Sequence, residues 1–115
     1  MSVTIYHNPR CSKSRQTLAL LEEKGVAPKI IDYLKEPPTV AELKAILKKL
    51  KLGPRDLMRK KEEPYKKLKL DNPKLTGDQL IKAMVDNPVL IERPIVVKGA
   101  KAALGRPPEQ VLDIL

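Results

Sequence analysis

The chain has 115 residues, of which 23 are Lys or Arg and 14 are Asp or Glu, so its net charge is +9 and its length supports one domain. Its content of 42% hydrophobic and 32% charged residues excludes wholesale disorder. The charge favours an anionic partner, but a chain without Phe or Trp has little with which to stack nucleic-acid bases. The one cysteine, Cys11, excludes an internal disulfide and a multi-cysteine zinc site.

The first third of the chain predicts a strand, a helix and a second strand. Val3–Tyr6 is β-branched and aromatic and precedes the turn signal Asn8-Pro9. A helix is expected from Cys11 or Ser12 to Lys24, with Gly25 at its left-handed end. Residues 29–34 predict the second strand, and the connection is long enough for the two strands to run parallel.

The middle of the chain predicts helices. Thr39 and Glu42 form a capping box, followed by an amphipathic apolar pattern over residues 43–50 that Gly53-Pro54 ends. A short helix is expected over residues 55–60, and residues 61–74 are expected to be mostly loop.

A second capping box, Thr76 with Gln79, opens another helix that Asn87-Pro88 ends. Residues 94–98 then predict a strand, Gly99 a turn, and residues 101–104 a strand that pairs back as a hairpin. Pro107-Pro108 can start a final helix.

The order of these elements indicates an α/β protein with a thioredoxin-like layout. The initial β-α-β and the final β-β-α form its two halves, giving a mixed four-stranded sheet. We expect residues 1–115 to form a single domain with a helical insertion at about residues 39–87.

Cys11 lies between a predicted strand and a predicted helix N-terminus. Unpaired backbone N–H groups and the positive end of the helix dipole meet there, and Arg10, Lys13 and Arg15 add positive charge. This setting lowers the pKa of a thiol and makes its thiolate a nucleophile. The alternative is a small, buried and unreactive cysteine.

Two further side chains belong to the same turn. His7, four residues upstream of Cys11, could tune the thiol, although a solvated turn histidine is the simpler interpretation. Ser14 stands where a thioredoxin would have its second cysteine, so the chain cannot resolve a disulfide by itself. The Ser14 hydroxyl could satisfy an amide of the helix start or contact a substrate.

Four short segments stand out in combination: HNPRCSKSR at residues 7–15, LMRK at 57–60, ERPIVV at 92–97 and GRPP at 105–108. Together they resemble the ArsC-type, glutaredoxin-linked arsenate reductases, and the short YfgD-like branch of that family in particular. The resemblance extends over essentially the whole chain. It implies a thioredoxin-like fold with an inserted helical segment, in agreement with the element order.

The resemblance also implies a reaction. Cys11 would attack the arsenic of arsenate, glutathione would attack the adduct as co-substrate, and glutaredoxin would resolve the mixed disulfide as arsenite leaves. The oxyanion would be held by three arginines, Arg59, Arg93 and Arg106. Guanidinium groups suit this task because they stay charged and bind such oxygens in pairs.

By the same resemblance, His7 would help to lower the pKa of Cys11, and Pro94 would follow a cis peptide bond beside the cysteine. Neither a bound cofactor nor a metal is implied.

Two other functions are compatible with the sequence. Spx-type regulators share the fold and bind RNA polymerase, but commonly carry a second cysteine where this chain has Ser14. Residues 48–69 carry ten Lys or Arg against three Asp or Glu and could bind nucleic acid, but three Tyr and no Phe or Trp in the whole chain, with no known DNA-reading motif, count against that function. A solvated basic face is the simpler interpretation of this stretch.

The compartment is predicted from what the sequence lacks. No basic segment followed by a long apolar run opens the chain, and no apolar run approaches the roughly 20 residues that span a membrane. A single unpaired cysteine fits a reducing compartment. We expect a cytoplasmic protein.

Overall fold

The computed structural model describes residues 2–115, which divide into two compact units. The first, here called the sheet unit, contains the residues up to Glu36 together with Arg93–Leu115. The second, the helical unit, is Pro37–Glu92 and follows the second strand in the sequence.

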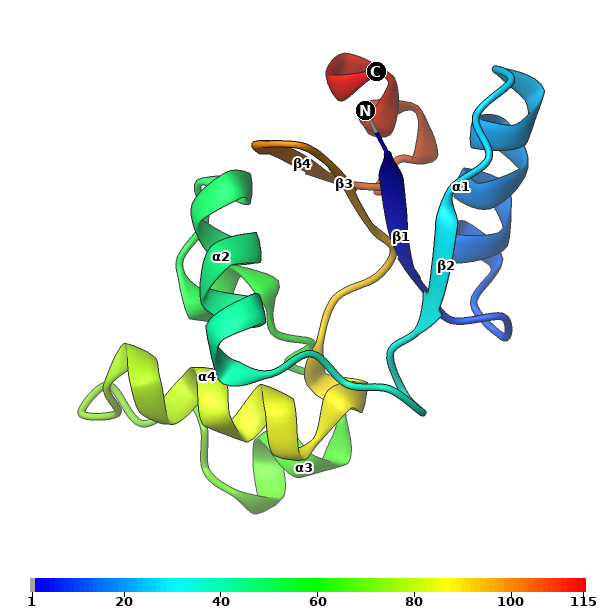
Figure 1. Cartoon of the computed structure of the whole chain (residues 1–115). Helices are drawn as coiled ribbons and strands as arrows, with labels where there is room; N and C mark the ends of the chain where they lie inside the picture. Colours follow the sequence, from blue (N-terminus) through cyan, green and yellow to red (C-terminus); the bar gives the residue numbers. More distant parts are fainter. Residues whose placement is uncertain (1) are drawn as a thin grey trace. The chain divides into compact units, whose positions relative to one another are not determined.

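The sheet unit is built on four strands, β1 (Val3–His7), β2 (Lys29–Asp32), β3 (Ile95–Lys98) and β4 (Lys101–Leu104). Their order across the sheet is β2-β1-β3-β4 (Figure 1). β2 runs parallel to β1, with Ile5 opposite Ile30, whereas β3 runs antiparallel to β1, with Ile5 opposite Val96. β4 pairs antiparallel with β3. The mixed four-stranded sheet of the prediction is confirmed.

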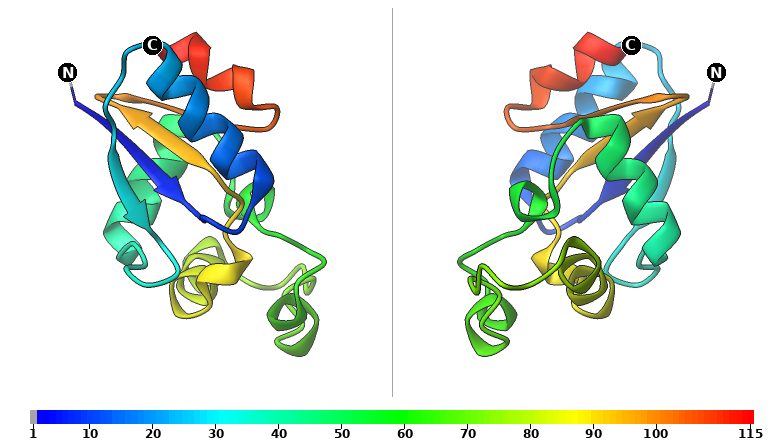
Figure 2. Two further views of the ribbon diagram at one scale, coloured as in Figure 1. Left: turned by 90° about the vertical axis from the view of Figure 1, so that its right-hand side faces the viewer. Right: turned by 90° about the vertical axis from the view of Figure 1, so that its left-hand side faces the viewer.

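One face of the sheet is covered by two helices. α1 (Ser12–Glu23) connects β1 to β2, and the 3-10 helix η3 (Pro108–Ile114) follows β4 and packs against α1 (Figure 2). The core between them is aliphatic, as a chain without Phe or Trp requires. Its buried members are Val3, Ile5, Leu21, Val96 and Val111.

Local signals account for the ends of these elements. α1 ends at Glu23, and Gly25, which follows the C-cap Lys24, has a φ of +79° in the left-handed region, as predicted. β2 is shorter than the predicted 29–34 because Asp32 forms a turn: its backbone carbonyl accepts from Lys35 and Glu36, and its side chain accepts from the Leu34 N–H. The last helix begins at Pro108 as expected but is a 3-10 helix.

The helical unit contains α2 (Val40–Leu50), η1 (Pro54–Leu57), α3 (Glu63–Lys67), α4 (Gly77–Asp86) and η2 (Pro88–Leu90). Both predicted capping boxes are present, Thr39 with Glu42 on α2 and Thr76 with Gln79 on α4. The two capped helices pack against each other.

One expectation for this unit is wrong, and a second holds except for one short helix. The short helix predicted over residues 55–60 is the 3-10 turn η1, which begins at Pro54 and ends at Leu57. Residues 61–74, expected to be mostly loop, include α3. α3 is only five residues long, so it shows no apolar periodicity in the sequence.

The prediction of a thioredoxin-like α/β fold with an inserted helical segment is thus confirmed. Within residues 2–115, no helix is both long enough and apolar enough to cross a bilayer.

Candidate active site

Cys11 is the N-cap residue of α1. The loop that carries it is held by Asn8, which is buried. The Asn8 backbone carbonyl accepts from the Cys11 N–H at 3.0 Å, and its side-chain oxygen accepts from the Arg10 N–H at 3.0 Å. These hydrogen bonds hold the Cys11 loop in position, and the partial exposure of Cys11 leaves it accessible to a small reagent.

The environment of Cys11 lowers the pKa of its thiol. Burial alone would raise this pKa, but it is outweighed by hydrogen bonds from the Ser14 and Lys13 backbone N–H groups and by the hydrogen bond and charge of the Arg93 side chain. The contribution of the helix start was predicted. The side-chain charge comes from Arg93, 82 positions along the chain, rather than from the neighbouring basic residues.

Arg93 and Arg106 reach the thiol from the end of the β3–β4 hairpin. The residues just before β3 and just after β4 continue the pairing of the two strands. The Gly105 N–H donates to the Pro94 carbonyl at 3.0 Å, and Arg106 Nε donates to the Arg93 carbonyl at 2.8 Å. The Arg106 side chain also extends to the cysteine, with Nη2 at 3.7 Å from Sγ. Two guanidinium groups therefore converge on one sulfur atom. Like charges on adjacent strands repel, so a bound anion between them would relieve that repulsion.

Gly105 makes this approach possible. A Cβ atom at residue 105 would lie 2.4 Å from Thr17 Oγ1 and 2.7 Å from Pro94 Cγ, closer than real Cβ atoms come to other heavy atoms. Thr17 is fully buried in α1, and its hydroxyl donates to the Lys13 carbonyl at 2.8 Å. The absence of a side chain at Gly105 therefore lets the end of β4, and with it Arg106, lie against α1.

The peptide bond between Arg93 and Pro94 is cis, as the resemblance implied. The bond between Arg106 and Pro107 is also cis, which was not predicted.

His7 and Ser14 lie beneath the thiol loop and are both buried. His7 Nδ1 and Ser14 Oγ share a hydrogen bond of 2.6 Å, and Ser14 Oγ also accepts from the Asn8 N–H at 3.0 Å. His7 is thus not the solvated turn residue of the simpler interpretation. Burial lowers its pKa, with Arg15 acting in the same direction and Asp32 against it. The imidazole is therefore neutral at pH 7, and its contact with the thiol loop is through Ser14.

Arg59 belongs to the helical unit, where two carboxylates engage it. Its Nη1 lies 2.7 Å from Glu92 Oε1, and its Nε lies 3.8 Å from Glu62 Oε2. Its backbone N–H donates to the Leu90 carbonyl at 2.7 Å, beside the antiparallel bridge between Met58 and Ile91. The sheet unit therefore brings together Cys11, Arg93 and Arg106, whereas the contacts of Arg59 are with its own unit.

Three residues of the site were not singled out from the sequence. Asn8 was noted as a turn signal and as part of a motif, Gly105 only as part of a motif, and Thr17 not at all. Asn followed by Pro is the one signal that could have identified Asn8, because Asn side chains often accept from an N–H two residues on. The contact between Gly105 and Thr17 joins segments 88 positions apart and leaves no local signal.

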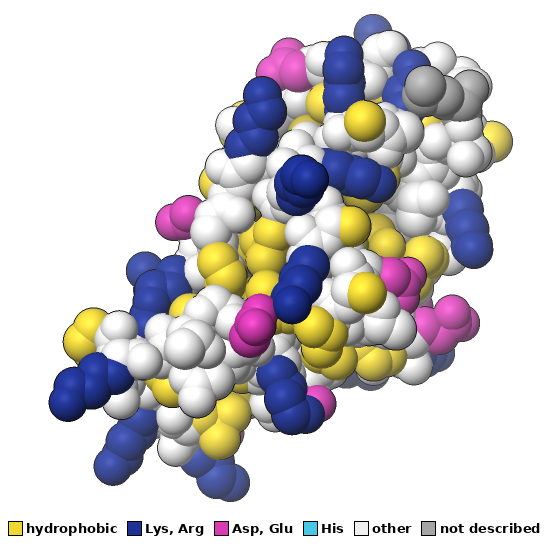
Figure 3. All heavy atoms as spheres, turned by 60° about the vertical axis from the view of Figure 1, so that its left-hand side comes forward, with side chains coloured by type: hydrophobic (Ala, Val, Ile, Leu, Met, Phe, Trp, Pro, Cys, Tyr) yellow, Lys and Arg dark blue, Asp and Glu magenta, His cyan; other side chains and the backbone are white. Residues whose placement is uncertain are grey.

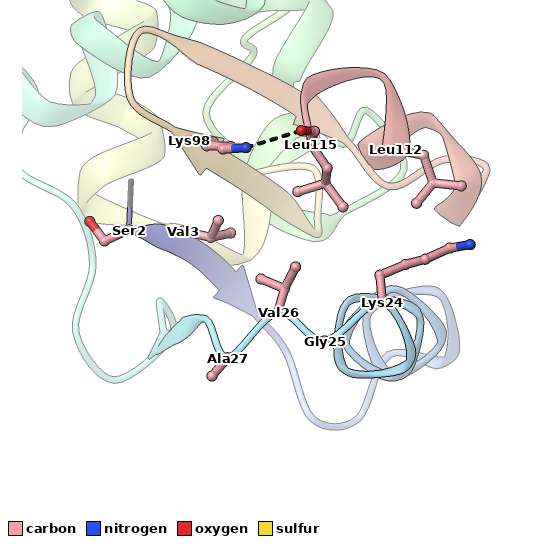
Figure 4. A pocket seen from close by; sticks show the side chains of 9 residues that line it. All are labelled: Ser2, Val3, Lys24, Gly25, Val26, Ala27, Lys98, Leu112 and Leu115. Carbon is pink, nitrogen blue, oxygen red and sulfur yellow. Dashed lines mark hydrogen bonds between the residues drawn. The ribbon is translucent and has the colours of Figure 1, made fainter.

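A cavity of about 630 Å³ in the sheet unit lies away from this cluster (Figure 4). It is lined by Lys24 and Gly25, at the far end of α1 from Cys11, and by residues of β3 and η3. There Lys98 Nζ donates to the Leu115 carbonyl at 3.0 Å. The 12 residues of α1 put it about 18 Å from the thiol.

Comparison with known proteins identifies the family. The model of the ArsC family matches residues 6–114. The chain is 57% identical to an arsenate reductase of Haemophilus influenzae, and the match covers all of both chains. It is also 57% identical to the uncharacterized protein YfgD of Escherichia coli, with 98% of this chain and 96% of the other covered. The solved structure of an arsenate reductase from Vibrio cholerae superposes with a TM-score of 0.97 at 58% identity, covering 100% of this chain and 98% of the other. The chain belongs to the ArsC family.

Proposed function

We propose that this chain reduces arsenate, or a similar tetrahedral oxyanion, through the Cys11 thiolate. The observation that carries the proposal is the convergence of Arg93 and Arg106 on the Cys11 sulfur at the start of α1. A thiolate that attacks an anion meets charge repulsion, and guanidinium groups with helix N–H donors offset it. The full-length relatives named arsenate reductase support arsenate as the substrate.

The proposed cycle balances through two thiols. The Cys11 thiolate attacks arsenic(V) to form a sulfur–arsenic bond, and an arsenate oxygen leaves as water. The glutathione thiolate then attacks the Cys11 sulfur, and the electron pair of the sulfur–arsenic bond goes to arsenic, which leaves as arsenite. The mixed disulfide between Cys11 and glutathione is reduced by a thiol of glutaredoxin, because this chain has no second cysteine. Such a cycle requires a reducing compartment such as the cytoplasm.

Each residue has a proposed role in this cycle. Arg93 and Arg106 bind the oxyanion oxygens and stabilise the thiolate. Arg59 is proposed as a third oxyanion ligand on the basis of the family motif. His7 and Ser14 position the thiol loop, and Pro94 fixes the backbone on which Arg93 lies. We further propose that both units act as one domain, since the family match runs through both.

The test is arsenate-dependent turnover in the presence of glutathione, glutaredoxin, glutathione reductase and NADPH, followed as NADPH oxidation. Cys11→Ser should abolish it, and Arg10→Ala serves as the matched control because Arg10 is an exposed neighbour of the cysteine. Omission of glutaredoxin tests that reductant in the same assay, whereas the need for glutathione is tested by measuring arsenite directly, because the NADPH readout itself depends on glutathione.

Full activity in a folded Cys11→Ser variant would exclude the proposed chemistry. Turnover that continues without glutaredoxin would exclude only the last step. Recovery of RNA polymerase subunits in a pull-down, with no oxyanion binding, would favour the regulator instead.

A further inference from the structure

Exposed lysines crowd the part of the helical unit around α3. They are Lys60, Lys61, Lys66, Lys67, Lys69 and Lys74. Within residues 2–115, none of these six forms an ion pair with a carboxylate. Figure 3 shows a face of the molecule on which Lys and Arg side chains predominate over Asp and Glu. The excess of positive charge around α3 is therefore exposed on the surface of the folded protein.

Several carboxylates of the same unit are engaged elsewhere. Glu62 and Glu92 pair with Arg59, and Asp78 pairs with Lys44. The Asp56 side chain accepts from the Gly53 N–H at 3.0 Å. These acids therefore leave the lysines around α3 available to carboxylates from outside the chain.

Two of these lysines, Lys66 and Lys69, line an open groove of about 520 Å³ together with Tyr65, Asp71 and Asn72. Beside it Leu68 is 49% exposed, an unusual position for a large apolar side chain surrounded by charges. The combination of cations, one aromatic ring and one exposed leucine is typical of a protein-binding surface.

The segment that carries the groove is held in a fixed shape. Arg55 donates from Nη1 to the Leu70 carbonyl at 2.6 Å and from Nη2 to the Asn72 carbonyl at 2.6 Å. Leu70 itself is buried. A surface held in this way loses little conformational entropy when a partner binds.

Lys69 has a backbone conformation that favours glycine. Its φ is +54°, its N–H donates to the Lys66 carbonyl, and the following Leu70 N–H donates to the Tyr65 carbonyl, which is a Schellman ending of α3. α1 ends in the same way with Gly25. A lysine at this position works against backbone preference, which suggests that its side chain has a use.

Lys51, with φ of +59° at the end of α2, has the same backbone conformation. It does not line the groove. The two lysines therefore share the left-handed backbone conformation and differ in that Lys69 lines the groove. Lys51 is for this reason a matched control for substitutions of Lys69.

We propose that the α3 lysine surface, defined as residues 65–69 with the groove beside them, docks an acidic segment of a partner protein. Carboxylates of that segment pair with Lys66, Lys67 and Lys69, and an apolar side chain between them packs on Leu68. A nucleic acid fits less well, because Tyr65 is the single ring among the groove-lining residues on which a base could stack, and a phosphate backbone has no apolar group to pack on the exposed Leu68. The proposal is independent of the chemistry of Cys11.

The test uses a fluorescent synthetic peptide in which pairs of Glu alternate with single Leu residues, with binding followed by fluorescence anisotropy. Lys69→Glu should weaken binding by about fivefold or more, whereas Lys51→Glu, which makes the same change of charge in the same backbone conformation, should weaken it by less than about twofold. A peptide with Ser in place of Leu should bind more weakly than the parent peptide, because Leu68 loses its apolar contact.

Lys69→Gly separates a structural role from a binding role. Glycine relieves the left-handed backbone, so the melting temperature should stay the same or rise while peptide binding weakens. Lys51→Gly should change the melting temperature in the same direction and leave binding unchanged.

Three outcomes would overturn the proposal. The first is no binding of the peptide. The second is equal losses in the Lys51 and Lys69 variants, which would reduce the effect to net charge. The third is tighter binding of a DNA duplex than of the peptide at the same salt concentration, which would assign the surface to nucleic acid.

Discussion

Gly105→Ala is the substitution whose effect the structure specifies most directly. The added Cβ would lie 2.4 Å from Thr17 Oγ1 and 2.7 Å from Pro94 Cγ. Neither neighbour yields cheaply: Thr17 is fully buried with its hydroxyl bonded to the Lys13 carbonyl, and Pro94 is a ring fixed in the backbone. Overpacking of this kind costs about 1–3 kcal/mol, and rotation of Thr17 would forfeit a hydrogen bond worth about 1 kcal/mol more. We therefore expect a loss of about 3 kcal/mol, measured by equilibrium urea unfolding.

A double-mutant cycle tests the mechanism of that loss. Thr17→Ala alone should cost about 1–2 kcal/mol, because a buried methyl group and a hydrogen bond are lost. In the Gly105→Ala background the same change removes two of the three close contacts, so it should cost little or nothing. The two substitutions should then couple by about 1–2 kcal/mol. Additive effects, or a Gly105→Ala variant within about 0.5 kcal/mol of the parent, would refute the steric argument.

Four further predictions concern the site. The rate of Cys11 alkylation by iodoacetamide should reach half its maximum below about pH 8.5, the ordinary pKa of a thiol, and Arg93→Gln should move that midpoint upward. Because the pKa of the Cys11 thiol is lower in the folded state than in the unfolded state, the thiolate stabilises the fold above the unfolded-state pKa. This stabilisation is lost as the pH falls through the folded-state pKa, and Cys11→Ser should remove that pH dependence from the free energy of urea unfolding. Arg106→Lys keeps the charge but loses the bond from Nε to the Arg93 carbonyl, so protection of the thiol by phosphate should need about tenfold more phosphate; unchanged protection would separate Arg106 from anion binding. His7 is the one histidine of the sequence, and its pKa is lowered in the folded state, so the unfolded state binds a proton more readily. The free energy of unfolding should therefore fall as the pH drops below about 6.5, and His7→Gln should flatten that part of its pH profile.

The features that could be predicted from the sequence are those with local causes. The capping boxes at Thr39 and Thr76 need only a hydroxyl and a side chain three residues later, and both are present. Cys11 at the start of α1 follows from a strand, a turn and a helix in succession. The parallel pairing of β1 with β2 and the hairpin of β3 with β4 follow from the pattern of β-α-β and β-β-α, whereas the pairing of β1 with β3 does not.

The features that could not be predicted depend on pairing between distant segments. The bond from Arg106 to the Arg93 carbonyl requires the register of β3 and β4 to continue past the hairpin, and the contact of Gly105 with Thr17 requires the packing of β4 on α1. The end of β2 was misjudged for a different reason: Asp32 can accept from three amides at once, and this turn competes with an extended strand.

The ion pair between Arg59 and Glu92 has a consequence for anion selectivity. An anion that binds Arg59 through Nη1 would have to displace the Glu92 carboxylate, whose Oε1 lies 2.7 Å from that atom. That carboxylate belongs to the same chain, so its local concentration far exceeds that of a free solute. Chloride and acetate carry a single charge and would gain little by this exchange. We therefore expect Arg59 to favour an anion that carries more charge over several oxygens.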